Sequence, residues 1–251
     1  MSARIINIVG TDTDVGKTIA TAAIAAARIT RGEKVAIFKP TQTGLTASLP
    51  GDAQLAAALS GAEAFEGARL RYPMAPVAAA HRENKPLPEL REHQDRVEDL
   101  LGRFDTVLVE GAGGVLVDLA EPLPASAGEC RSQNQADLML ALAAVGVPMV
   151  TVIVARAGLG TLNHTGLTAH YLASRGLDVT GIVIGAAPAH PSPVEASNLE
   201  HLERSGLTIL GAIPEGTGKG FIVGENERVL HSPEEIAEFR AQAPSWLPGL
   251  A

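Results

Sequence analysis

One segment near the amino terminus, Gly-Thr-Asp-Thr-Asp-Val-Gly-Lys-Thr, limits the possible folds of this chain more than any other feature. It runs from Gly10 to Thr18, follows directly on an apolar run at residues 5–9, and leads into an alanine-rich stretch at residues 19–29. This order predicts a strand, a tight loop and a helix. Free amides at the start of such a helix concentrate partial positive charge and bind phosphate. The segment therefore indicates a phosphate-binding loop in an α/β fold.

The residues of this loop have distinct expected roles. Lys17 would reach the outer phosphates of a nucleotide, and the hydroxyl of Thr18 would hold Mg²⁺. The usual pattern has four residues between the first glycine and Gly-Lys-Thr, whereas here residues 11–15 intervene, which is one residue more. The nucleotide-binding candidates in and after the loop are Asp14, Val15, Gly16, Lys17, Thr18 and Ile19.

Apolar, often β-branched runs recur through the chain. Most are continuous rather than alternating, as in strands buried on both faces of a parallel sheet. They lie at residues 5–9, 35–38, 106–109, 149–154, 179–184 and 207–213. Helical patterns separate them, at residues 19–31, 54–59, 94–101, 137–144, 162–174, 194–204 and 233–242. This alternation predicts a P-loop NTPase-type α/β fold, an open and mainly parallel sheet with helices on both faces, in a single domain over residues 1–251.

Several polar residues follow the predicted strands, where ligands of open α/β sheets bind. Lys39 comes directly after the second run, so its ammonium group would lie near the terminal phosphate. Thr43 follows in a turn bounded by proline and glycine. Glu110 ends the third run before a glycine-rich turn, and a carboxylate in that position matches the Mg²⁺-side acid of nucleotide hydrolases. Asp52 precedes a short helix, and its local pattern alone predicts an N-cap.

Composition narrows the class of function. The net charge of −8 argues against general binding to nucleic acid or anionic membranes, although a local phosphate site can still form. The single cysteine, Cys130, excludes an intrachain disulfide and is expected to be an incidental thiol. The most apolar stretch, residues 138–155, contains Gly146 and Pro148 and is expected to form a helix end, a turn and a strand. We find no targeting segment and expect a cytoplasmic protein.

Four motifs together resemble those of the dethiobiotin synthetase family, in that family's order. They are the phosphate loop, Lys39-Pro with Thr43-Gly close behind, Glu110-Gly-Ala-Gly-Gly, and Leu159-Gly-Thr-Leu-Asn-His. The resemblance extends from about residue 5 to residue 214. It implies an ATP- and Mg²⁺-dependent carboxylation of 7,8-diaminononanoate with CO₂, followed by closure of a cyclic urea. A substrate carbamate would attack the γ-phosphoryl group to give a carbamic–phosphoric anhydride, and the second amine would then displace phosphate.

The resemblance also implies a role for each matching residue. Because a carbamate and a triphosphate repel each other, the site needs cations fixed in advance. The implied catalytic residues are Lys39, Lys17 and Thr13, and the implied Mg²⁺ ligands are Thr18, Asp52 and Glu110. The nucleotide would also contact Glu110 and Pro214. The implied substrate contacts are Thr13, Lys39, Thr43, Gly111, Ala112, Gly160 and Asn163, the last two from the partner subunit of a homodimer.

One departure from the family and two alternatives remain. Some members place an asparagine after the fifth strand to bind adenine, whereas residues 185–191 contain none, so base recognition is expected from backbone groups at residues 214–216. The first alternative is a partitioning-type switch ATPase that acts through a protein partner, but such proteins carry an extra lysine that residues 11–15 lack. A cobalamin-type amidotransferase would need a glutaminase portion with a nucleophilic cysteine. The predicted loop at residues 122–135, with Cys130 and Arg131, receives no role.

Overall fold

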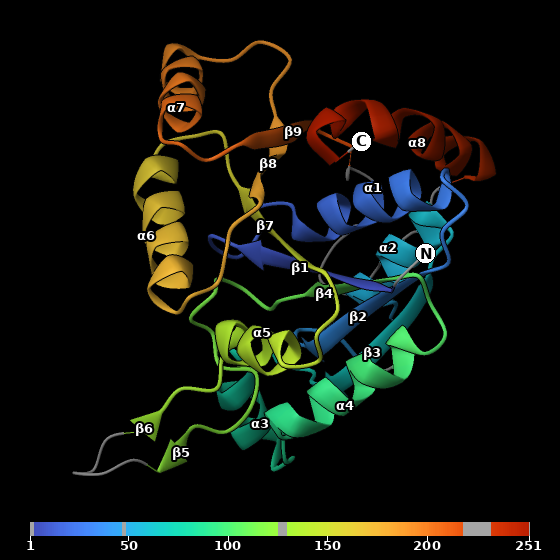
Figure 1. Ribbon diagram of the computed structural model, residues 1–251, viewed down its shortest axis with the longest axis vertical. Coiled ribbons are helices and arrows are strands. Elements are labelled where there is room, and N and C mark those ends of the chain that lie inside the picture. Colours follow the sequence, from blue (N-terminus) through green and yellow to red (C-terminus); the bar gives the residue numbers. More distant parts are fainter. Residues whose placement is uncertain (1–2, 47–48, 125–129, 218–231, 251) are drawn as a thin grey trace.

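The computed structural model describes residues 3–46, 49–124, 130–217 and 232–250. Its main sheet has seven parallel strands in the order β3-β2-β4-β1-β7-β8-β9 (Figure 1). These strands are β1 (Arg4–Gly10), β2 (Val35–Gln42), β3 (Glu63–Arg69), β4 (Thr106–Glu110), β7 (Met149–Ala155), β8 (Gly181–Ala187) and β9 (Ile209–Pro214). The phosphate loop therefore follows a central strand, with β4 on one side of β1 and β7 on the other.

Helices cover both faces of the sheet, as the sequence predicts. On one face lie α1 (Lys17–Ile29), α2 (Asp52–Ser60) and α8 (Pro233–Trp246), followed by the short helix η2 (Pro248–Leu250). The other face is covered by α4 (Leu90–Leu101), α5 (Gln135–Ala143), α6 (Thr161–Ser174) and α7 (Pro193–Arg204) (Figure 1), and α3 (Pro76–Glu83) precedes α4 in the chain. Successive residues of β1 point to opposite faces, so Ile6 and Ile8 pack in the cluster under α1 while Ile5 and Val9 pack on the far side.

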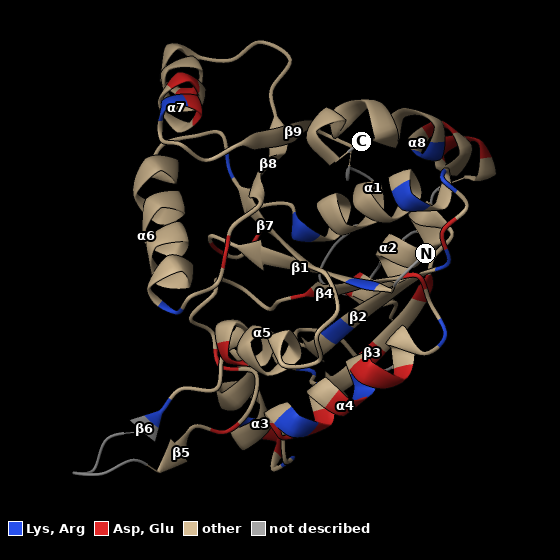
Figure 2. Cartoon of the chain, in the orientation of Figure 1, with Lys and Arg blue, Asp and Glu red and all other residues tan. Residues whose placement is uncertain are grey.

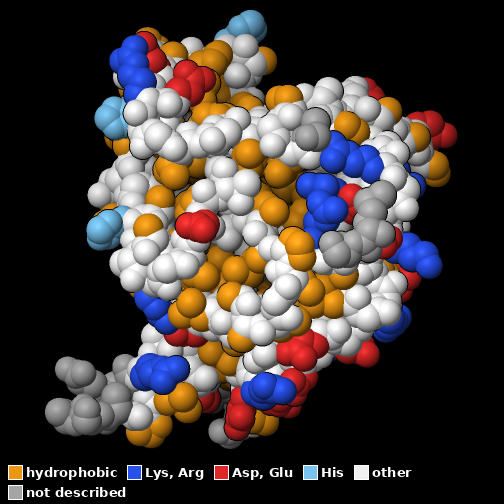
Figure 3. Space-filling view, viewed as in Figure 1, with side chains coloured by type: hydrophobic (Ala, Val, Ile, Leu, Met, Phe, Trp, Pro, Cys, Tyr) orange, Lys and Arg blue, Asp and Glu red, His pale blue; other side chains and the backbone are white. Residues whose placement is uncertain are grey.

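Charged side chains are distributed unevenly over these helices. Figure 2 shows acidic and basic residues concentrated on α4, α7 and α8, whereas α6 carries no lysine, arginine, aspartate or glutamate. On the face shown in Figure 3, apolar side chains come to the surface near the centre and charged side chains lie mainly toward the rim. The uncharged surface of α6 also carries Leu167, whose side chain is exposed.

The second strand is longer than the apolar run that predicts it. The run ends at Phe38, but β2 continues to Gln42, so Lys39 and Pro40 lie inside the strand. Pairing with β4 stops at Phe38, while pairing with β3 continues to Gln42. Proline has no backbone N–H to donate, and it is tolerated here because β4 does not pair with this part of β2. Lys39 therefore lies within a strand and not after its end.

Two elements lack a clear signal in the sequence. The strand β3 contains Glu63, Glu66 and Arg69, and it lies at the edge of the sheet, where it pairs only with β2. A half-exposed edge strand needs no continuous apolar run, so hydrophobicity does not reveal it. The helix α3 begins with Pro76 and is short, which gives too few turns for a clear helical period.

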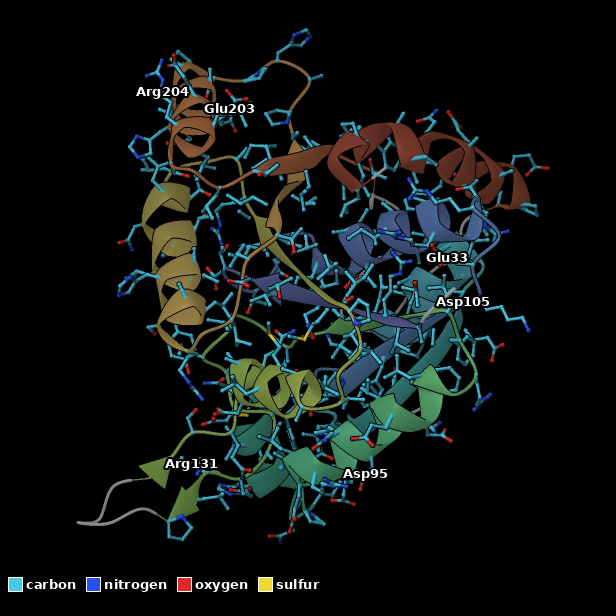
Figure 4. The ribbon with its side chains drawn as sticks, viewed as in Figure 1. Glu33, Asp95, Asp105, Arg131, Glu203 and Arg204 are labelled. Carbon is cyan, nitrogen blue, oxygen red and sulfur yellow. The ribbon has the colours of Figure 1, made fainter. Side chains whose placement is uncertain are left out.

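The predicted loop at residues 122–135 contains two short strands. Within residues 122–135 the structure has the antiparallel strands β5 (Leu123–Pro124) and β6 (Cys130–Arg131), which project from the body of the molecule with Arg131 exposed (Figure 4). Residues 125–129 and the side chain of Cys130 lie outside what the structure describes. Among the described ranges, no helix is long and apolar enough to cross a membrane.

The edge of the sheet where the strands begin carries its own polar contacts. Glu33 and Asp105, labelled in Figure 4, lie just before β2 and β4. The hydroxyl of Thr106 donates to Glu33 at 2.5 Å, and the amide of Lys34 donates to Asp105 at 2.8 Å. These bonds join the starts of β2 and β4. The candidate site lies at the opposite edge of the sheet, where the strands end.

Candidate active site

The loop between β1 and α1 presents free backbone amides at the carboxyl edge of the sheet. Gly16 is the N-cap of α1, with φ 94°, and no side chain caps the first turn. A Cβ atom on Gly16 would lie 2.7 Å from the carbonyl oxygen of Gly185 on β8. Only glycine fits there, because the left-handed backbone and the close carbonyl both exclude a side chain. The first-turn amides of α1 therefore remain available to an anion such as phosphate.

Lys17 lies folded along the phosphate loop. Its side chain is mostly buried, and Nζ donates to the backbone carbonyl of Asp12 at 2.8 Å. Burial, followed by the nearby charge of Lys39, lowers the pKa of Lys17 to about 8. Asp12 is itself held by Arg156, which follows β7, at 2.7 Å. A carbonyl is a weaker partner for an ammonium group than a phosphate oxygen, so a bound nucleotide can take over this lysine.

Glu110 is fully buried at the end of β4 and accepts hydrogen bonds on both carboxylate oxygens. Its Oε1 accepts from the hydroxyl of Thr18 at 3.1 Å and from Nζ of Lys39 at 2.8 Å. Its Oε2 accepts from the hydroxyl of Thr21 at 2.6 Å. The carboxylate is thus fixed by α1 on one side and by β2 on the other.

Lys39 connects both predicted metal-binding carboxylates. It is 3% exposed, and besides Glu110 its Nζ contacts Oδ2 of Asp52 at 3.1 Å and the carbonyl of Gly111 at 2.9 Å. Burial alone would lower the pKa of Lys39, but the carboxylates of Glu110 and Asp52 raise it above the usual value. The ammonium group therefore stays charged at neutral pH.

Asp52 is not the N-cap that its local pattern predicts. Gly51 is the N-cap of α2, and Asp52 is the first residue of the helix. The amide of Asp52 donates to the side-chain oxygen of Gln42 at 2.7 Å, which orients the start of α2 against the end of β2. The carboxylate can therefore reach Lys39 instead of capping the helix.

These groups surround a cleft of about 760 Å³ at the carboxyl edge of the sheet. Most of the residues expected at the site line it: Thr13, Asp14, Gly16, Lys17, Thr18, Ile19, Lys39, Thr43, Asp52, Glu110 and Ala112. The order β2-β4-β1 brings them together, because Lys39, Glu110 and the phosphate loop come from adjacent strands (Figure 1).

The other expected site residues lie elsewhere. The side chain of Val15 packs in the core, so only its backbone can face a ligand, and Gly111 contributes its carbonyl to Lys39. Gly160 is the N-cap of α6, and both it and Asn163 are exposed on that helix. Pro214 is the last residue of β9, which is separated from β1 by β7 and β8. None of these five residues is part of the cleft lining formed by the described residues.

Sequence reasoning missed three features of the cleft. Thr21 supports Glu110, Gln42 orients Asp52, and the loop at residues 73–76 before and into α3 forms part of the wall. A signal for Thr21 was present, since it follows Thr18 by three residues and so lies on the same helical face. The loop had no comparable signal, because it belongs to the edge region around β3.

The oxygen atoms around Lys39 fit Mg²⁺, although the described residues hold no group of three histidine, cysteine or acidic side chains suited to a metal ion. Mg²⁺ takes one or two carboxylates together with water and phosphate oxygens. The hydroxyl of Thr18 and the carboxylates of Glu110 and Asp52 form a donor set of this kind, beside the loop that would hold the phosphates.

The parallel sheet and the phosphate loop define the class of protein: the chain has the fold of the P-loop nucleoside triphosphatases. The chain resembles the cell division ATPase MinD of Pyrococcus furiosus, at 19% identity, full coverage of both chains and a TM-score of 0.54. It also resembles the septum site-determining protein MinD of Pyrococcus horikoshii, solved with Mg-ADP, at 18% identity, 99% and 91% coverage and a TM-score of 0.53. At such low identity these likenesses show the fold alone. The model of the AAA domain family matches residues 4–218.

Sequence relatives are more specific. The chain is 41% identical to the ATP-dependent dethiobiotin synthetase BioD of Streptomyces avermitilis, over 96% of this chain and 90% of the relative. It is 42% identical to the BioD protein of Rhodococcus jostii over 86% and 88% of the two chains, and 44% identical to that of Mycobacterium avium over 78% and 80%. The chain belongs to the dethiobiotin synthetase family, and is thus an enzyme of the ligase class that forms C–N bonds.

Proposed function

We propose that the protein carboxylates 7,8-diaminononanoate with CO₂ and closes the product to dethiobiotin, using ATP and Mg²⁺. The observation that carries this proposal is the convergence of two buried lysines and two carboxylates on one cleft behind the phosphate loop. The extra lysine of a partitioning-type switch ATPase lies in the phosphate loop, whereas the second lysine here, Lys39, lies on β2. A second, strand-mounted lysine suits a reaction in which another anion must meet the γ-phosphate.

The position of each residue in the cleft indicates its role. The amides at the start of α1 and the ammonium group of Lys17 bind the phosphates of ATP, while Thr18, Asp52 and Glu110 hold Mg²⁺. When bound, the metal neutralises charge on the β- and γ-phosphates and orients them. Lys39 stabilises the substrate carbamate as its oxygen attacks the γ-phosphorus, since a fixed cation offsets the repulsion between two anions.

The remaining predicted residues bind the diamine. Thr13 and Thr43 offer hydroxyls that line the cleft, and Ala112 is a small residue of the same lining. The second amine then attacks the activated carbonyl carbon, forms the second C–N bond of the ring and expels phosphate. The nucleotide base would lie toward Pro214, where β9 ends at the same edge of the sheet.

We further propose a homodimer in which Gly160 and Asn163 serve the partner's substrate. Both residues are exposed at the start of α6, away from the cleft of their own subunit. Leu159 is 85% exposed and Leu167 is 61% exposed, and α6 has no charged residue (Figure 2). Exposed leucines on an uncharged helix favour a protein partner. A monomeric mass by light scattering, at concentrations where the protein is active, would refute the dimer.

The test of the proposed reaction is fixation of labelled bicarbonate into an acid-stable product by purified protein, Mg²⁺, ATP and 7,8-diaminononanoate. We expect a labelled cyclic urea that requires every component and disappears in the Lys39→Ala variant. Phosphate release without the diamine, with no label fixed in the presence of ATP or CTP, would instead support a switch ATPase that acts through a protein partner.

A further inference from the structure

Lys39 occupies the space between the two carboxylates that the proposed function assigns to Mg²⁺. Its Nζ lies 2.8 Å from Oε1 of Glu110 and 3.1 Å from Oδ2 of Asp52. The side chain of Glu110 is fully buried, and that of Lys39 is 4% exposed, so solvent screens this contact little. The same carboxylate oxygens cannot give their full negative charge to both a buried ammonium group and a divalent cation.

The contacts of Lys39 are those of a substitute for a metal ion. The ammonium group satisfies two carboxylates and one backbone carbonyl, that of Gly111, all of them oxygen acceptors. Without this lysine, Glu110 would be a buried charge with only hydroxyl donors, those of Thr18 and Thr21. Burial of an uncompensated carboxylate is unfavourable, so some cation must be present when no metal is bound.

We propose that Lys39 is the resident cation of the metal site, so that binding of a divalent cation displaces the ammonium group from Glu110 and Asp52 and delivers it to the reacting carbamate. This role rests on the proposed function, because it assumes that these carboxylates hold Mg²⁺. In this exchange, binding of the metal ion and release of the Lys39 ammonium group are the same event. Lys39 therefore becomes available to the carbamate only when nucleotide and metal are bound.

Two features allow the exchange to occur without loss of the site. Lysine has a long flexible stem, and Lys39 already lines the cleft, so its ammonium group can move toward the substrate while the strand stays fixed. Glu110 keeps its orientation because Thr21 bonds Oε2, the oxygen that Lys39 does not contact. Thr21 is therefore a positioning residue that serves both the resting and the metal-bound state.

The first test measures Mn²⁺ binding to the nucleotide-free protein by electron paramagnetic resonance, at constant near-neutral pH. If Lys39 occupies the site at least nine-tenths of the time, its removal should strengthen Mn²⁺ binding by about tenfold or more. The test variant is Lys39→Met, which keeps the apolar stem. Mn²⁺ binding by Lys39→Met that is no tighter than in the wild type would overturn the proposal.

The matched control is Lys17→Met. It removes the same charge from the same cleft, but Nζ of Lys17 bonds the carbonyl of Asp12 rather than a carboxylate. We expect Lys17→Met to strengthen Mn²⁺ binding by about threefold at most, because it only removes one nearby positive charge from the cleft. An equal gain in both variants would mean that Lys39 acts only through its charge, and would also overturn the proposal.

A second measurement uses the unchanged Lys39, because its removal leaves Glu110 without a cation and can prevent folding. In protein labelled with ¹⁵N at lysine Nζ, the buried ammonium group of Lys39 should exchange slowly with water and give an observable signal, assigned by its absence in Lys39→Arg. We expect the signal to persist with ADP and a chelator and to be lost or shifted when Mg²⁺ is added. An unchanged signal at saturating Mg²⁺ and ADP would contradict the exchange.

Failure of this inference can be separated from failure of the proposed function. Neither measurement contains the diamine or bicarbonate, so a protein that fixes no label can still exchange Lys39 for a metal. Conversely, if the protein fixes label but its Lys39 signal does not change with Mg²⁺, the proposed carboxylation would stand and the exchange would be rejected.

Discussion

The hydroxyl of Thr21 donates to Oε2 of Glu110 at 2.6 Å, and both side chains are fully inaccessible to solvent. Thr21 lies on α1 and Glu110 at the end of β4, so this bond joins the helix that follows the phosphate loop to the strand that carries the acid. A hydrogen bond to a buried charge is stronger than one between neutral groups. The contact therefore determines where the carboxylate points.

Replacement of Thr21 by valine should weaken metal use. The substitution keeps the shape but leaves a buried carboxylate oxygen without a donor, a loss of about 1–3 kcal/mol. We expect the Mg²⁺ concentration for half-maximal turnover to rise about tenfold while the KM for the diamine changes little. Thr21→Ser, which keeps the hydroxyl, should restore the wild-type Mg²⁺ requirement. A wild-type requirement in Thr21→Val would exclude a positioning role.

Replacement of Lys17 or Lys39 by alanine should remove most turnover. Each ammonium group is a donor to charge that develops in the reaction, and single donors of this kind contribute about 10²–10³ in rate. Bicarbonate fixation measures the loss, and circular dichroism checks that the fold is retained. If either alanine variant turned over at a near-normal rate, its assignment would be wrong.

Gly16→Ala should abolish tight nucleotide binding. The new Cβ would lie 2.7 Å from the carbonyl oxygen of Gly185, and the backbone at φ 94° already disfavours a side chain. We expect affinity for an ATP analogue, measured by calorimetry, to fall by about five- to 150-fold, since strain of this kind is typically about 1–3 kcal/mol. The loop must shift to relieve the contact, and its amides then no longer converge on phosphate.

Gly146→Ala is the matched control for Gly16→Ala. Gly146 lies between α5 and β7 and also has a positive φ, 78°, but a Cβ there meets no atom within 4 Å. Its replacement should lower stability by about 1–2 kcal/mol and leave nucleotide affinity unchanged. Equal losses of affinity in the two variants would show that backbone strain alone, and not the contact with Gly185, explains the effect.

Arg69 should affect metal use from a distance. Its guanidinium donates to the carbonyl of Leu49 at 2.5 Å, to that of Thr46 at 3.2 Å and to the side chain of Gln54 at 3.0 Å. These bonds hold described residues on both sides of Asp52. We expect Arg69→Met to raise the Mg²⁺ requirement about three- to tenfold, as expected for loss of one or two net hydrogen bonds. Arg71→Met removes an arginine whose side chain is 63% exposed and, within the described part of the chain, has no bond to Leu49 or Gln54; it is the control and should leave the Mg²⁺ requirement unchanged.

His93 should make the fold sensitive to acid. It is buried on α4 against Phe38, and burial lowers its pKa to about 4. In the unfolded chain the imidazole takes up a proton near pH 6.5, so the unfolded state binds more protons as pH falls from 6.5 toward 4. The free energy of unfolding should drop by about 3 kcal/mol across this window. Urea unfolding should give a smaller drop for His93→Gln, and equal drops would contradict this account.

Much of the nucleotide half of the site could be predicted from the sequence, because it depends on local chemistry. The phosphate loop is a continuous segment, and residues 5–9, 106–109 and 149–154 are mainly apolar because their strands are buried on both faces. The expected roles of Lys17, Thr18 and Glu110 follow from their places in the phosphate loop and at the end of a strand. The family followed from adding the other motifs in order.

The environment of each group required the tertiary structure. Lys39 and Glu110 are 71 residues apart in the sequence, and they meet each other and Asp52 because β2 and β4 are neighbours and α2 begins beside them. No local signal reveals strand order, because a parallel pair is joined by a crossover that can lead to either side. The edge strand β3 was missed for a related reason, since its polar residues are tolerated only at the edge.

The sequence by itself therefore determined the fold class, the phosphate loop and the identity of the acids and lysines. Only the tertiary structure decided that Lys39 binds both carboxylates, that Thr21 supports Glu110, and that Gly51 rather than Asp52 is the N-cap of α2. The physical reason is that hydrophobic periodicity and backbone preferences act over a few residues. The pairing of buried charges depends on which distant segments the sheet places side by side.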